Sequence, residues 1–443
     1  RISGKDAIAI TDRIFTPVGK HPLPLSERKA YTMAFGHIRQ DDGEIIDEVL
    51  IGLFKSPHSY TGEDCVEISC HGSSFILQQV MQLLIRKGCR AAGPGEFTQR
   101  AFLNGKMDLS QAEAVADLIA SSSAATHRMA MNQMRGGFSR ELSALRERLL
   151  HLTSLMELEL DFSDHEELEF ADRSELETIA GDIEKVISGL VHSFSVGNVL
   201  KNGIPVAIVG ETNAGKSTLL NTLLNEEKAI VSDIHGTTRD VIEDTVNLSG
   251  ITFRFIDTAG IRDTHDTIEN MGIARSFHKM EQAEIVLWVV DNTCAEAQIR
   301  QLSPRILPLC FNKQLIILLN KSDQVSAVPT KLSGLPENTV TLSISAKEKT
   351  GIQELQNLLV KTASVPELTS SDLIVTNVRH YEALSLALED IHRVQNGLQT
   401  HLSGDLISQD LRECLFHLAE IVGGEITADE VLGNIFMKFC IGK

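Results

Sequence analysis

The sequence has few features of an exported or membrane protein. Its seven cysteines are odd in number and include no C-x-x-C pair, so neither a disulfide framework nor a zinc ribbon is indicated. No uninterrupted apolar run reaches the ~18 residues of a membrane span, and no signal peptide is recognisable. We therefore predict a reducing, cytoplasmic compartment and no membrane. The chain opens at Arg1 without an initiator methionine, so we also expect a leading segment before it.

Positive charge is scarce. The 443 residues hold 41 basic and 60 acidic side chains, which gives a formal net charge of −19. A generic basic nucleic-acid coat needs a positive surface and is disfavoured, whereas a local basic patch for RNA stays open. The composition, 42% hydrophobic and 23% charged, is that of an ordinary globular protein of about three domains.

Residues 1–105 alternate short β-like runs with turns. Val49–Phe54 and Val66–Ser69 predict strands, and Phe75–Arg86 predicts a helix. We predict a small α+β domain in this segment.

Long amphipathic helices are predicted on both sides of residues 201–365. Thr427 and Glu430 form a capping box for a last helix. The acidic stretch Asp161–Glu169 has two interpretations, a metal site or a solvated loop, and the loop is favoured because fixed ligand spacing is missing. In 106–200 and 366–443 the following apolar residues recur at three- and four-residue steps: Val115, Leu118, Ile119, Leu142, Leu145, Leu149, Leu152, Met156, Leu160, Leu176, Ile179, Ile183, Ile187, Leu190, Phe194, Leu384, Leu388, Ile391, Leu411, Leu415 and Leu418.

Strands and helices alternate from 201 to 365, so an α/β unit interrupts the helical one. The simplest account is the insertion of a whole domain at a helix–helix connection. The predicted fold class is multidomain α/β. It comprises the N-terminal α+β domain (1–105), a helical domain in two segments (106–200 and 366–443), and an inserted Ras-like P-loop domain (201–365) with a mostly parallel sheet and helices on both faces.

The strongest motif begins after the apolar run Ile204–Val209. Gly210 to Ser217 match G-x-x-x-x-G-K-[ST] between a predicted strand and a predicted helix at Thr218–Leu224. The glycines let backbone N–H groups face phosphates, and the helix dipole favours the anion. Lys216 is predicted to reach the β- and γ-phosphates, and the Ser217 hydroxyl to bind Mg²⁺.

Three further motifs follow predicted strands. Asp257 to Gly260 place an acid that can hold Mg²⁺ through water and an N–H that can sense the γ-phosphate. Asn320 to Asp323 place a carboxylate that can accept from the guanine N1–H and 2-amino groups, which adenine lacks as a pair. Ser345 to Lys347 complete the base-contacting loops. The combination predicts a site for GTP rather than ATP.

The catalytic machinery departs from the Ras type. Ile261 follows Gly260, where Ras-like proteins carry a glutamine that orients the attacking water. Something else must therefore position this water. The loop from Gly236 to Asp240 supplies Thr238 as the second Mg²⁺ ligand. Arg239 is interpreted as a member of a structural ion pair, and an arginine finger in cis is the alternative.

These residues resemble those of the MnmE/TrmE family of tRNA-modification GTPases, over essentially the whole chain. The helix–GTPase–helix interruption is also that family's architecture. The matching stretches are Gly93 to Thr98, Arg100 to Lys106, Asp108 to Leu109, Gln111 to Ala114, Gly236 to Asp240 and the terminal Phe439 to Lys443.

The resemblance implies a K⁺-stimulated GTPase that dimerises through its GTPase domains. In that scheme K⁺ is coordinated by Asn213 with Ser232, Ile234 and Thr237, and it offsets transition-state charge. Glu269 is the implied catalytic, water-orienting acid. For both Asn213 and Glu269, a purely structural or surface role is the alternative. The implied GTP-binding residues are Gly210, Asn213, Ala214, Gly215, Lys216, Ser217, Thr218, Ser232, Asp233, Ile234, His235, Gly236, Thr237, Thr238, Asp257, Thr258, Ala259, Gly260, Asn320, Lys321, Asp323, Ser345, Ala346 and Lys347.

The N-terminal segment resembles the family's tetrahydrofolate-binding domain. Arg1, Glu67, Lys106 and Lys443 match its 5-formyl-tetrahydrofolate contacts. A carboxylate can accept pterin N–H bonds, and a cation can pair with the folate glutamate. Family members carry a glycine-rich stretch before Arg1, so we expect a shortened first strand. Cys440 is either a nucleophile near the folate or, as favoured here, a small buried hydrophobe.

The resemblance implies one function, and a second function is its alternative. In the first, the chain is a GTP hydrolase that acts with the FAD-carrying flavoprotein MnmG. Together they install aminomethyl or carboxymethylaminomethyl groups at C5 of the wobble uridine of certain tRNAs, with folate supplying the one-carbon unit. In the second, it is a ribosome-assembly or other regulatory switch without modification chemistry.

Overall fold

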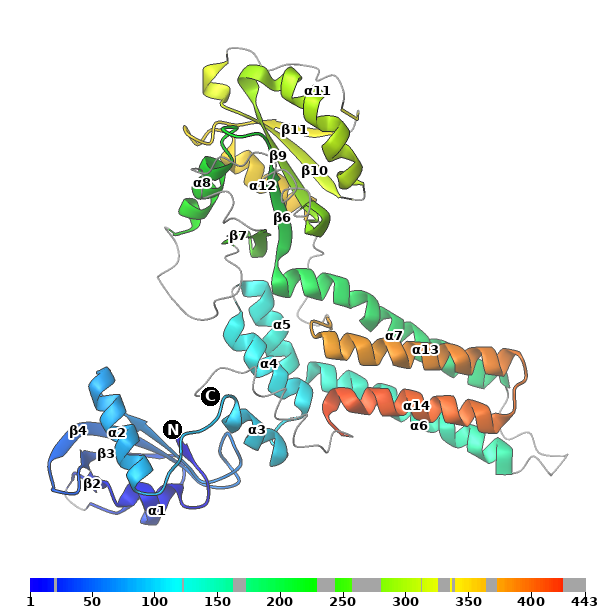
Figure 1. Ribbon diagram of the computed structural model, residues 1–443. Coiled ribbons are helices and arrows are strands. Elements are labelled where there is room, and N and C mark those ends of the chain that lie inside the picture. The colour runs from blue at the N-terminus through cyan, green and yellow to red at the C-terminus, as the bar shows by residue number, and fades with distance from the viewer. Residues whose placement is uncertain are drawn as a thin grey trace. The chain divides into compact units, whose positions relative to one another are not determined.

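A computed structural model describes most of the chain and divides it into two compact units (Figure 1). Unit 1 comprises Arg1–Ala120, Ala130–Ser188 and Glu382–Lys443, and unit 2 comprises Ser121–Met129 and Gly189–Tyr381. Within the described ranges, no helix is both long and apolar enough to cross a membrane. The structure describes residues 1–19, 22–121, 123–161, 173–228, 244–256, 280–311, 313–325, 335–336, 339–363 and 373–424.

An antiparallel sheet of five strands opens unit 1, in the order β1-β5-β4-β3-β2. Buried and exposed side chains alternate along its longer strands with the two-residue period of a β-strand. In β4, Val49, Ile51 and Leu53 are buried, whereas Glu48 and Leu50 are exposed. The strands are β1 (Ile2–Ser3), β2 (Phe15–Pro17), β3 (Thr32–Arg39), β4 (Ile45–Phe54) and β5 (Cys65–Ser69).

Helices bury one face of this sheet. Val80 and Leu83 of α2 and Ile8 of α1 share a core with Ile51 and Val66 of the strands. The predicted strands and the predicted helix of this segment are confirmed, and β4 starts earlier than predicted, at Ile45. The elements are α1 (Ala7–Asp12), the 3-10 turn η1 (Leu25–Glu27), α2 (Ser74–Arg86) and α3 (Glu96–Leu103).

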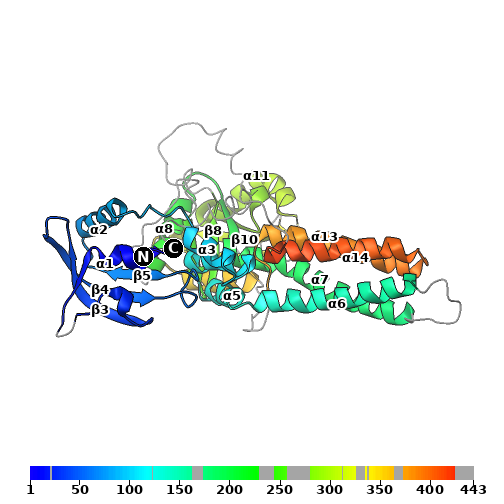
Figure 2. The same cartoon turned by 90° about the horizontal axis from the view of Figure 1, so that it is seen from below.

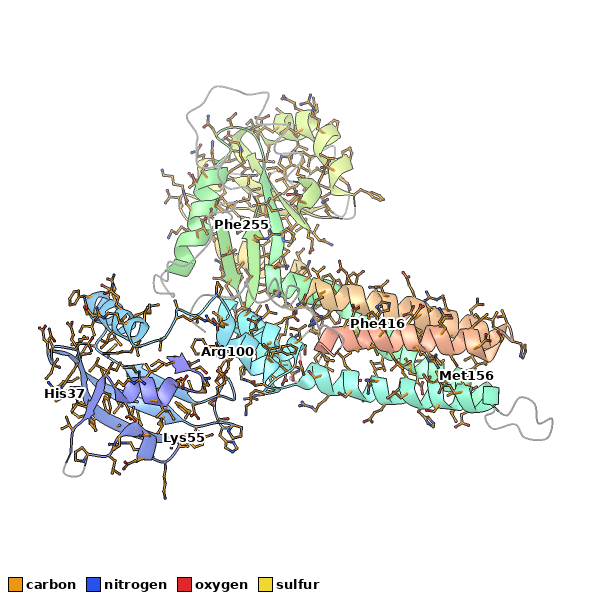
Figure 3. The ribbon with its side chains drawn as sticks, turned by 60° about the horizontal axis from the view of Figure 1, so that its bottom comes forward. His37, Lys55, Arg100, Met156, Phe255 and Phe416 are labelled. Atoms are coloured by element: carbon orange, nitrogen blue, oxygen red, sulfur yellow. The ribbon has the colours of Figure 1, made fainter. Side chains whose placement is uncertain are left out.

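Long helices from two distant parts of the sequence pack side by side in unit 1 (Figures 1 and 2). Arg412 of α14 pairs with Glu157 of α6 at 2.7 Å, and Arg393 of α13 pairs with Asp410 of α14 at 2.8 Å. Met156, labelled in Figure 3, is among the buried residues of α6. Parts of three of these helices, α5, α7 and α13, belong to unit 2. The helices are α4 (Leu109–Ala120), α5 (Ala124–Met134), α6 (Gly137–Asp161), α7 (Arg173–Asn202), α13 (Val378–Gln399) and α14 (Gly404–Val422).

The helical periodicity read from the sequence is confirmed where the structure describes it. The predicted positions from Leu142 to Met156 are buried, as are Leu176, Ile183, Ile187, Leu384, Ile391 and Leu411. In α4 the pattern was less accurate, because Leu109, Ala112 and Ala114 are buried whereas Ile119 is exposed. Thr427 and Glu430, and nearly all of the acidic stretch after Asp161, lie outside the described residues.

Unit 2 holds a six-stranded sheet in the order β11-β10-β9-β6-β8-β7, parallel except for β7. Strand β6 is buried on both faces, as parallel strands in α/β proteins are. Val206 and Ile208 face the core formed with α8 and α12, and Ala207 and Val209 face the core formed with α11. The strands are β6 (Ile204–Val209), β7 (Asp244–Leu248), β8 (Ile251–Phe255), β9 (Ile285–Asp291), β10 (Gln314–Asn320) and β11 (Val340–Ser343).

Helices cover both faces of this sheet (Figure 1). Phe255 of β8, labelled in Figure 3, is buried in the core between the sheet and these helices. The predicted fold class, multidomain α/β with a mostly parallel sheet between helices, is confirmed. The sequence did not predict the antiparallel strand β7. The helical elements are α8 (Lys216–Lys228), η2 (Asn292–Cys294), α11 (Ala295–Ile306), η3 (Leu307–Cys310), η4 (Ser322–Gln324) and α12 (Ile352–Thr362).

Candidate functional site

The loop between β6 and α8 has a shape that only glycine allows at two positions. Gly210 has φ +148°, and a Cβ there would lie 2.2 Å from the Val289 carbonyl oxygen. Gly215 has φ +97°, and a Cβ there would lie 2.1 Å from Nδ2 of Asn320. A side chain at either position would be strained and would clash. The loop therefore packs directly on the ends of β9 and β10.

Lys216 begins α8 and turns back over this loop. Its Nζ donates to the carbonyl oxygens of Gly210 at 2.8 Å and Glu211 at 2.6 Å. These bonds fix the ammonium above the loop, beside the N-terminal turn of a helix. Ser217 is half-buried in the same turn, and Thr218 and Asn213 are exposed. Cation and helix N-terminus together favour a phosphate group.

Asn320 ties the loop to the last strands of the sheet. It is 3% exposed, and its Nδ2 donates to the Ala214 carbonyl at 2.8 Å. Its Oδ1 accepts from the Ala346 N–H at 3.0 Å, and Thr222 of α8 donates to the Ala346 carbonyl at 3.0 Å. Three motifs separated in the sequence are thus joined through one buried amide.

Asp323 is exposed but held in place. The Ser345 hydroxyl, fully buried, donates to Oδ1 of Asp323 at 2.6 Å and accepts from the Glu348 N–H at 3.2 Å. A carboxylate so oriented can accept two hydrogen bonds from a ligand edge. Lys347 is largely exposed beside it.

Lys321 is anchored on the neighbouring strand. It adopts φ +64°, and its Nζ pairs with Oδ2 of Asp291 at the end of β9 at 2.5 Å. Burial by itself raises the pKa of Asp291, but hydrogen bonds from Lys321 and Thr293 outweigh it, so the pKa lies below its ordinary value. Asp291 therefore remains a carboxylate at neutral pH and holds the lysine.

Of the predicted folate-binding residues, the structure brings Arg1 and Glu67 together but not Lys106. Arg1 donates from Nε to Oε1 of Glu67 at 2.8 Å, and its guanidinium lies 5.6 Å from the Tyr60 ring centroid and 5.8 Å from that of Phe97. Lys106 instead donates to the Pro57 carbonyl at 3.1 Å. The charge pair and the two aromatic rings could receive a planar, partly charged ligand.

The same unit holds a half-buried charge network around Arg100. Arg100 of α3, labelled in Figure 3, bonds to Glu63 at 3.0 Å and to Glu96 at 2.8 Å, and Ser3 donates to Glu63 at 2.9 Å. The hydrogen bond from Arg90 lowers the pKa of Glu96 to about 2, against the opposing effect of burial and with help from the Gly93 N–H and Arg100.

The following candidates lie outside the described residues: Ser232, Asp233, Ile234, His235, Gly236, Thr237, Thr238, Arg239, Asp257, Thr258, Ala259, Gly260, Glu269, Cys440 and Lys443. Within the described ranges, the six remaining cysteines are all unpaired.

Comparison with known proteins decides the family. A family model described as the MnmE helical domain matches residues 109–440, and one described as the GTP-binding protein TrmE N-terminus matches residues 1–106. The chain belongs to the MnmE family. The resemblance predicted from the sequence is therefore confirmed.

Similar MnmE proteins share the full length of this chain. Proteins named tRNA modification GTPase MnmE are 65% identical in Bacteroides thetaiotaomicron and 52% identical in Flavobacterium johnsoniae. Each match covers 100% of this chain, and 96% and 95% of the two relatives. A structure of Era with MgGDPNP and a 16S ribosomal RNA fragment is 28% identical to this chain, with a TM-score of 0.28. The match covers 42% of this chain and 65% of the Era chain.

Sequence reasoning missed residues that support the MnmE motifs from outside them. Thr222, Asp291 and Gln298 act through hydrogen bonds across the sheet edge, and no motif marks them. Tyr60 and Phe97 gave no signal of their own. Phe97 and Arg100 did lie within stretches that matched the family, but their partners could not be read from spacing.

Proposed function

We propose that this chain hydrolyses GTP and acts in the modification of the wobble uridine of certain tRNAs. The observation that supports it most is the buried Asn320 amide, which joins the phosphate loop at Ala214 to the base-contacting loop at Ala346. In this proposal Asp323 reads the guanine edge, Lys321 lies along the base, and Lys216 contacts the β- and γ-phosphates. The proposed role in tRNA modification is supported by the relatives named tRNA modification GTPase MnmE.

Hydrolysis needs positive charge that the described loop supplies only in part. The Ser217 hydroxyl lies one residue after Lys216 and is a hard oxygen donor, as Mg²⁺ prefers, so we propose Ser217 and Thr238 as magnesium ligands. We propose Asn213, Ser232, Ile234 and Thr237 as ligands of K⁺. When bound, these cations would offset negative charge that develops on the phosphates.

The chain's own residues would then orient the reactants. Lys216 holds the phosphates, Gly260 donates its N–H near the γ-phosphate, and Glu269 orients the attacking water as a carboxylate. The Ras-type glutamine is replaced by Ile261, which cannot do this. For the remaining nucleotide contacts we propose the other GTP-binding residues that were predicted from the sequence.

The N-terminal sheet is proposed to bind 5-formyl-tetrahydrofolate through Arg1, Glu67, Lys106 and Lys443. The Arg1–Glu67 pair fits such a group, because a carboxylate and a guanidinium beside two aromatic faces match the polar edge and flat ring of a pterin. The folate would supply the one-carbon unit. Cys440 is not assigned a catalytic role.

The working assembly is proposed to be a cytoplasmic homodimer that associates through the GTPase domains and binds the FAD protein MnmG and tRNA. We propose four segments: the folate-binding domain (1–105), the two halves of the helical domain (106–200 and 366–443) and the GTPase domain (201–365). GTP hydrolysis would drive association and dissociation of the GTPase domains and so rearrange the complex.

Two measurements test this function. GTP turnover is expected to be stimulated by KCl and not by NaCl at equal ionic strength, and the full-length protein is expected to bind 5-formyl-tetrahydrofolate. An Arg1→Ala, Glu67→Ala variant is expected to lose folate binding and keep turnover. Failure of both measurements would favour a regulatory switch without modification chemistry.

A further inference from the structure

One buried glutamine connects the phosphate loop to the end of β9, one of the two central strands of the unit 2 sheet. Gln298 lies on α11 and is 8% exposed. Its Nε2 donates to Oε2 of Glu211 at 2.9 Å, and its Oε1 accepts from the Asp291 N–H at 2.9 Å. Both ends of one amide are therefore used, by two segments 80 residues apart in the sequence.

The partner in the phosphate loop is a carboxylate, which an anion-binding loop should disfavour. Glu211 directly follows Gly210, and its own carbonyl accepts from Lys216. A free carboxylate beside a polyphosphate would raise the energy of the bound state, since like charges repel strongly where water is excluded. The bond from the buried Gln298 holds this carboxylate on the α11 side of the loop.

The other end of the amide leads to the base-contacting motif. Gln298 fixes the backbone of Asp291, and the Asp291 carboxylate binds Lys321 at 2.5 Å and Thr293 at 2.7 Å. β6, β9 and β10 are neighbours in the sheet. Glu211 lies just after β6, Asp291 is the last residue of β9 and Lys321 lies just after β10, so all three are at the same edge. The four residues form a continuous chain of hydrogen bonds, Glu211–Gln298–Asp291–Lys321.

This series of hydrogen bonds is separate from the one made by Asn320, because the two share no residue. Asn320 joins the backbone of the phosphate loop to the backbone at Ala346. The second chain of hydrogen bonds instead passes through the Asp291 backbone N–H and ends in two charged side chains, Glu211 and Lys321. Its role is therefore electrostatic as well as geometric.

We infer that Gln298 is a positioning residue for nucleotide binding, which turns the Glu211 carboxylate away from the phosphates and links the phosphate loop to Lys321. The inference rests on the proposed GTP site. Gln298 itself touches no nucleotide in this account. Its loss is expected to raise KM and the nucleotide dissociation rate, while kcat at saturating GTP stays nearly unchanged.

The test exchanges the carboxylate of Glu211 and the carboxamide of Gln298. Gln298→Glu keeps the size of the side chain and the acceptor for Asp291, but it cannot donate to Glu211 and adds a like charge. Loss of a hydrogen bond to a charged group corresponds to about a tenfold or larger change, so mant-GDP should dissociate about tenfold faster. The double variant Glu211→Gln, Gln298→Glu exchanges donor and acceptor and should return the rate to within about twofold of wild type.

Controls separate positioning from general destabilisation. Gln301→Glu adds the same charge at an exposed position of α11 and should not alter dissociation. The melting temperature of each nucleotide-free variant is measured, and Gln298→Met, which loses both bonds without adding charge, replaces Gln298→Glu if the latter unfolds in the assay. Gln298→Met should also release mant-GDP faster, by a smaller factor.

The outcomes are distinct. If wild type binds mant-GDP and Lys216→Ala does not, the proposed site stands. Wild-type dissociation rates in Gln298→Glu and Gln298→Met would then overturn the inference alone, as would a double variant that is no better than Gln298→Glu. Lys216→Ala binding as tightly as wild type would instead contradict the proposed site and remove the basis of the inference.

Discussion

The side-chain amide of Asn320 donates to the carbonyl oxygen of Ala214 across 2.8 Å, in a position where only 3% of Asn320 is exposed. This bond connects the end of β10 to the loop that precedes α8. The same amide accepts from the Ala346 N–H. The conformation of the phosphate loop and that of the base-contacting loop therefore depend on each other.

Asn320→Ala is expected to weaken guanine nucleotide binding and to lower stability. It leaves the buried Ala214 carbonyl and the Ala346 N–H without their partner, which costs about 1–3 kcal/mol for each buried polar group. Titration with mant-GDP should show at least a tenfold weaker Kd, and thermal melting should show a lower midpoint. Asn357→Ala, on the exposed face of α12, is the matched control. Equal nucleotide affinity for both variants would contradict the role of Asn320.

Asp323→Asn is expected to change base specificity rather than abolish activity. A carboxylate accepts from the 2-amino and N1–H groups of guanine, whereas a carboxamide can donate to the 2-oxo group that xanthine carries in place of that amine. The variant should therefore lose GTP turnover by at least a hundredfold and gain XTP turnover. Wild type with XTP and the variant with GTP are the reciprocal controls. A variant that discriminates GTP from XTP as wild type does would refute the contact.

Glu269→Ala tests the catalytic acid predicted from the sequence. Since the carboxylate is proposed to orient water and not to hold nucleotide, the Kd for mant-GDP should stay within about twofold while kcat falls by about 10²-fold or more. Glu296→Ala, an exposed carboxylate in the first turn of α11, should change neither quantity. Near-normal turnover of Glu269→Ala would refute the assignment.

The pH dependence of unit 1 should depend on Glu96. Its pKa is about 2 in the folded protein, against an ordinary value of 4.5 for a glutamate side chain. Because the folded pKa is depressed, the carboxylate contributes stability above pH 4.5, at most ~3 kcal/mol, and this is lost as the pH falls through 2. The melting temperature of Glu96→Gln should lie below that of wild type at neutral pH, and the difference should shrink between pH 4.5 and 2.

Glu44→Gln serves as the control for this titration, since it removes an exposed carboxylate of the same domain. Its melting temperature should follow that of wild type at every pH. A difference between Glu96→Gln and wild type that does not change with pH would show that the network with Arg90 and Arg100 does not stabilise the fold through its charge.

The elements of the fold could be predicted because their patterns are local. The apolar run Ile204–Val209 and the three- and four-residue steps from Leu142 to Met156 each report burial of their own element. Strand β7 was missed because Asp244–Leu248 pairs at the edge, where only Val246 is buried. A single buried position gives no period to read.

The candidate site was predictable only where a motif names its residues. Lys216, Asn320 and Asp323 follow strands at fixed offsets, so the sheet topology places them at one edge. Gln298 and Asp291 could not be found in this way. Their importance depends on which strands are neighbours and on where α11 packs, and both are properties of the tertiary structure. Likewise, Arg100 and Glu63 meet only after the antiparallel sheet has formed.

We propose that GTP hydrolysis at this site serves tRNA modification. It is tested most directly by analysing the nucleosides of tRNA from cells that lack the gene and carry either the wild-type copy or Lys216→Ala. The account predicts that the modified wobble uridine disappears in the deletion, returns with the wild-type copy and stays absent with Lys216→Ala. An unchanged wobble uridine profile in the deletion strain would contradict it.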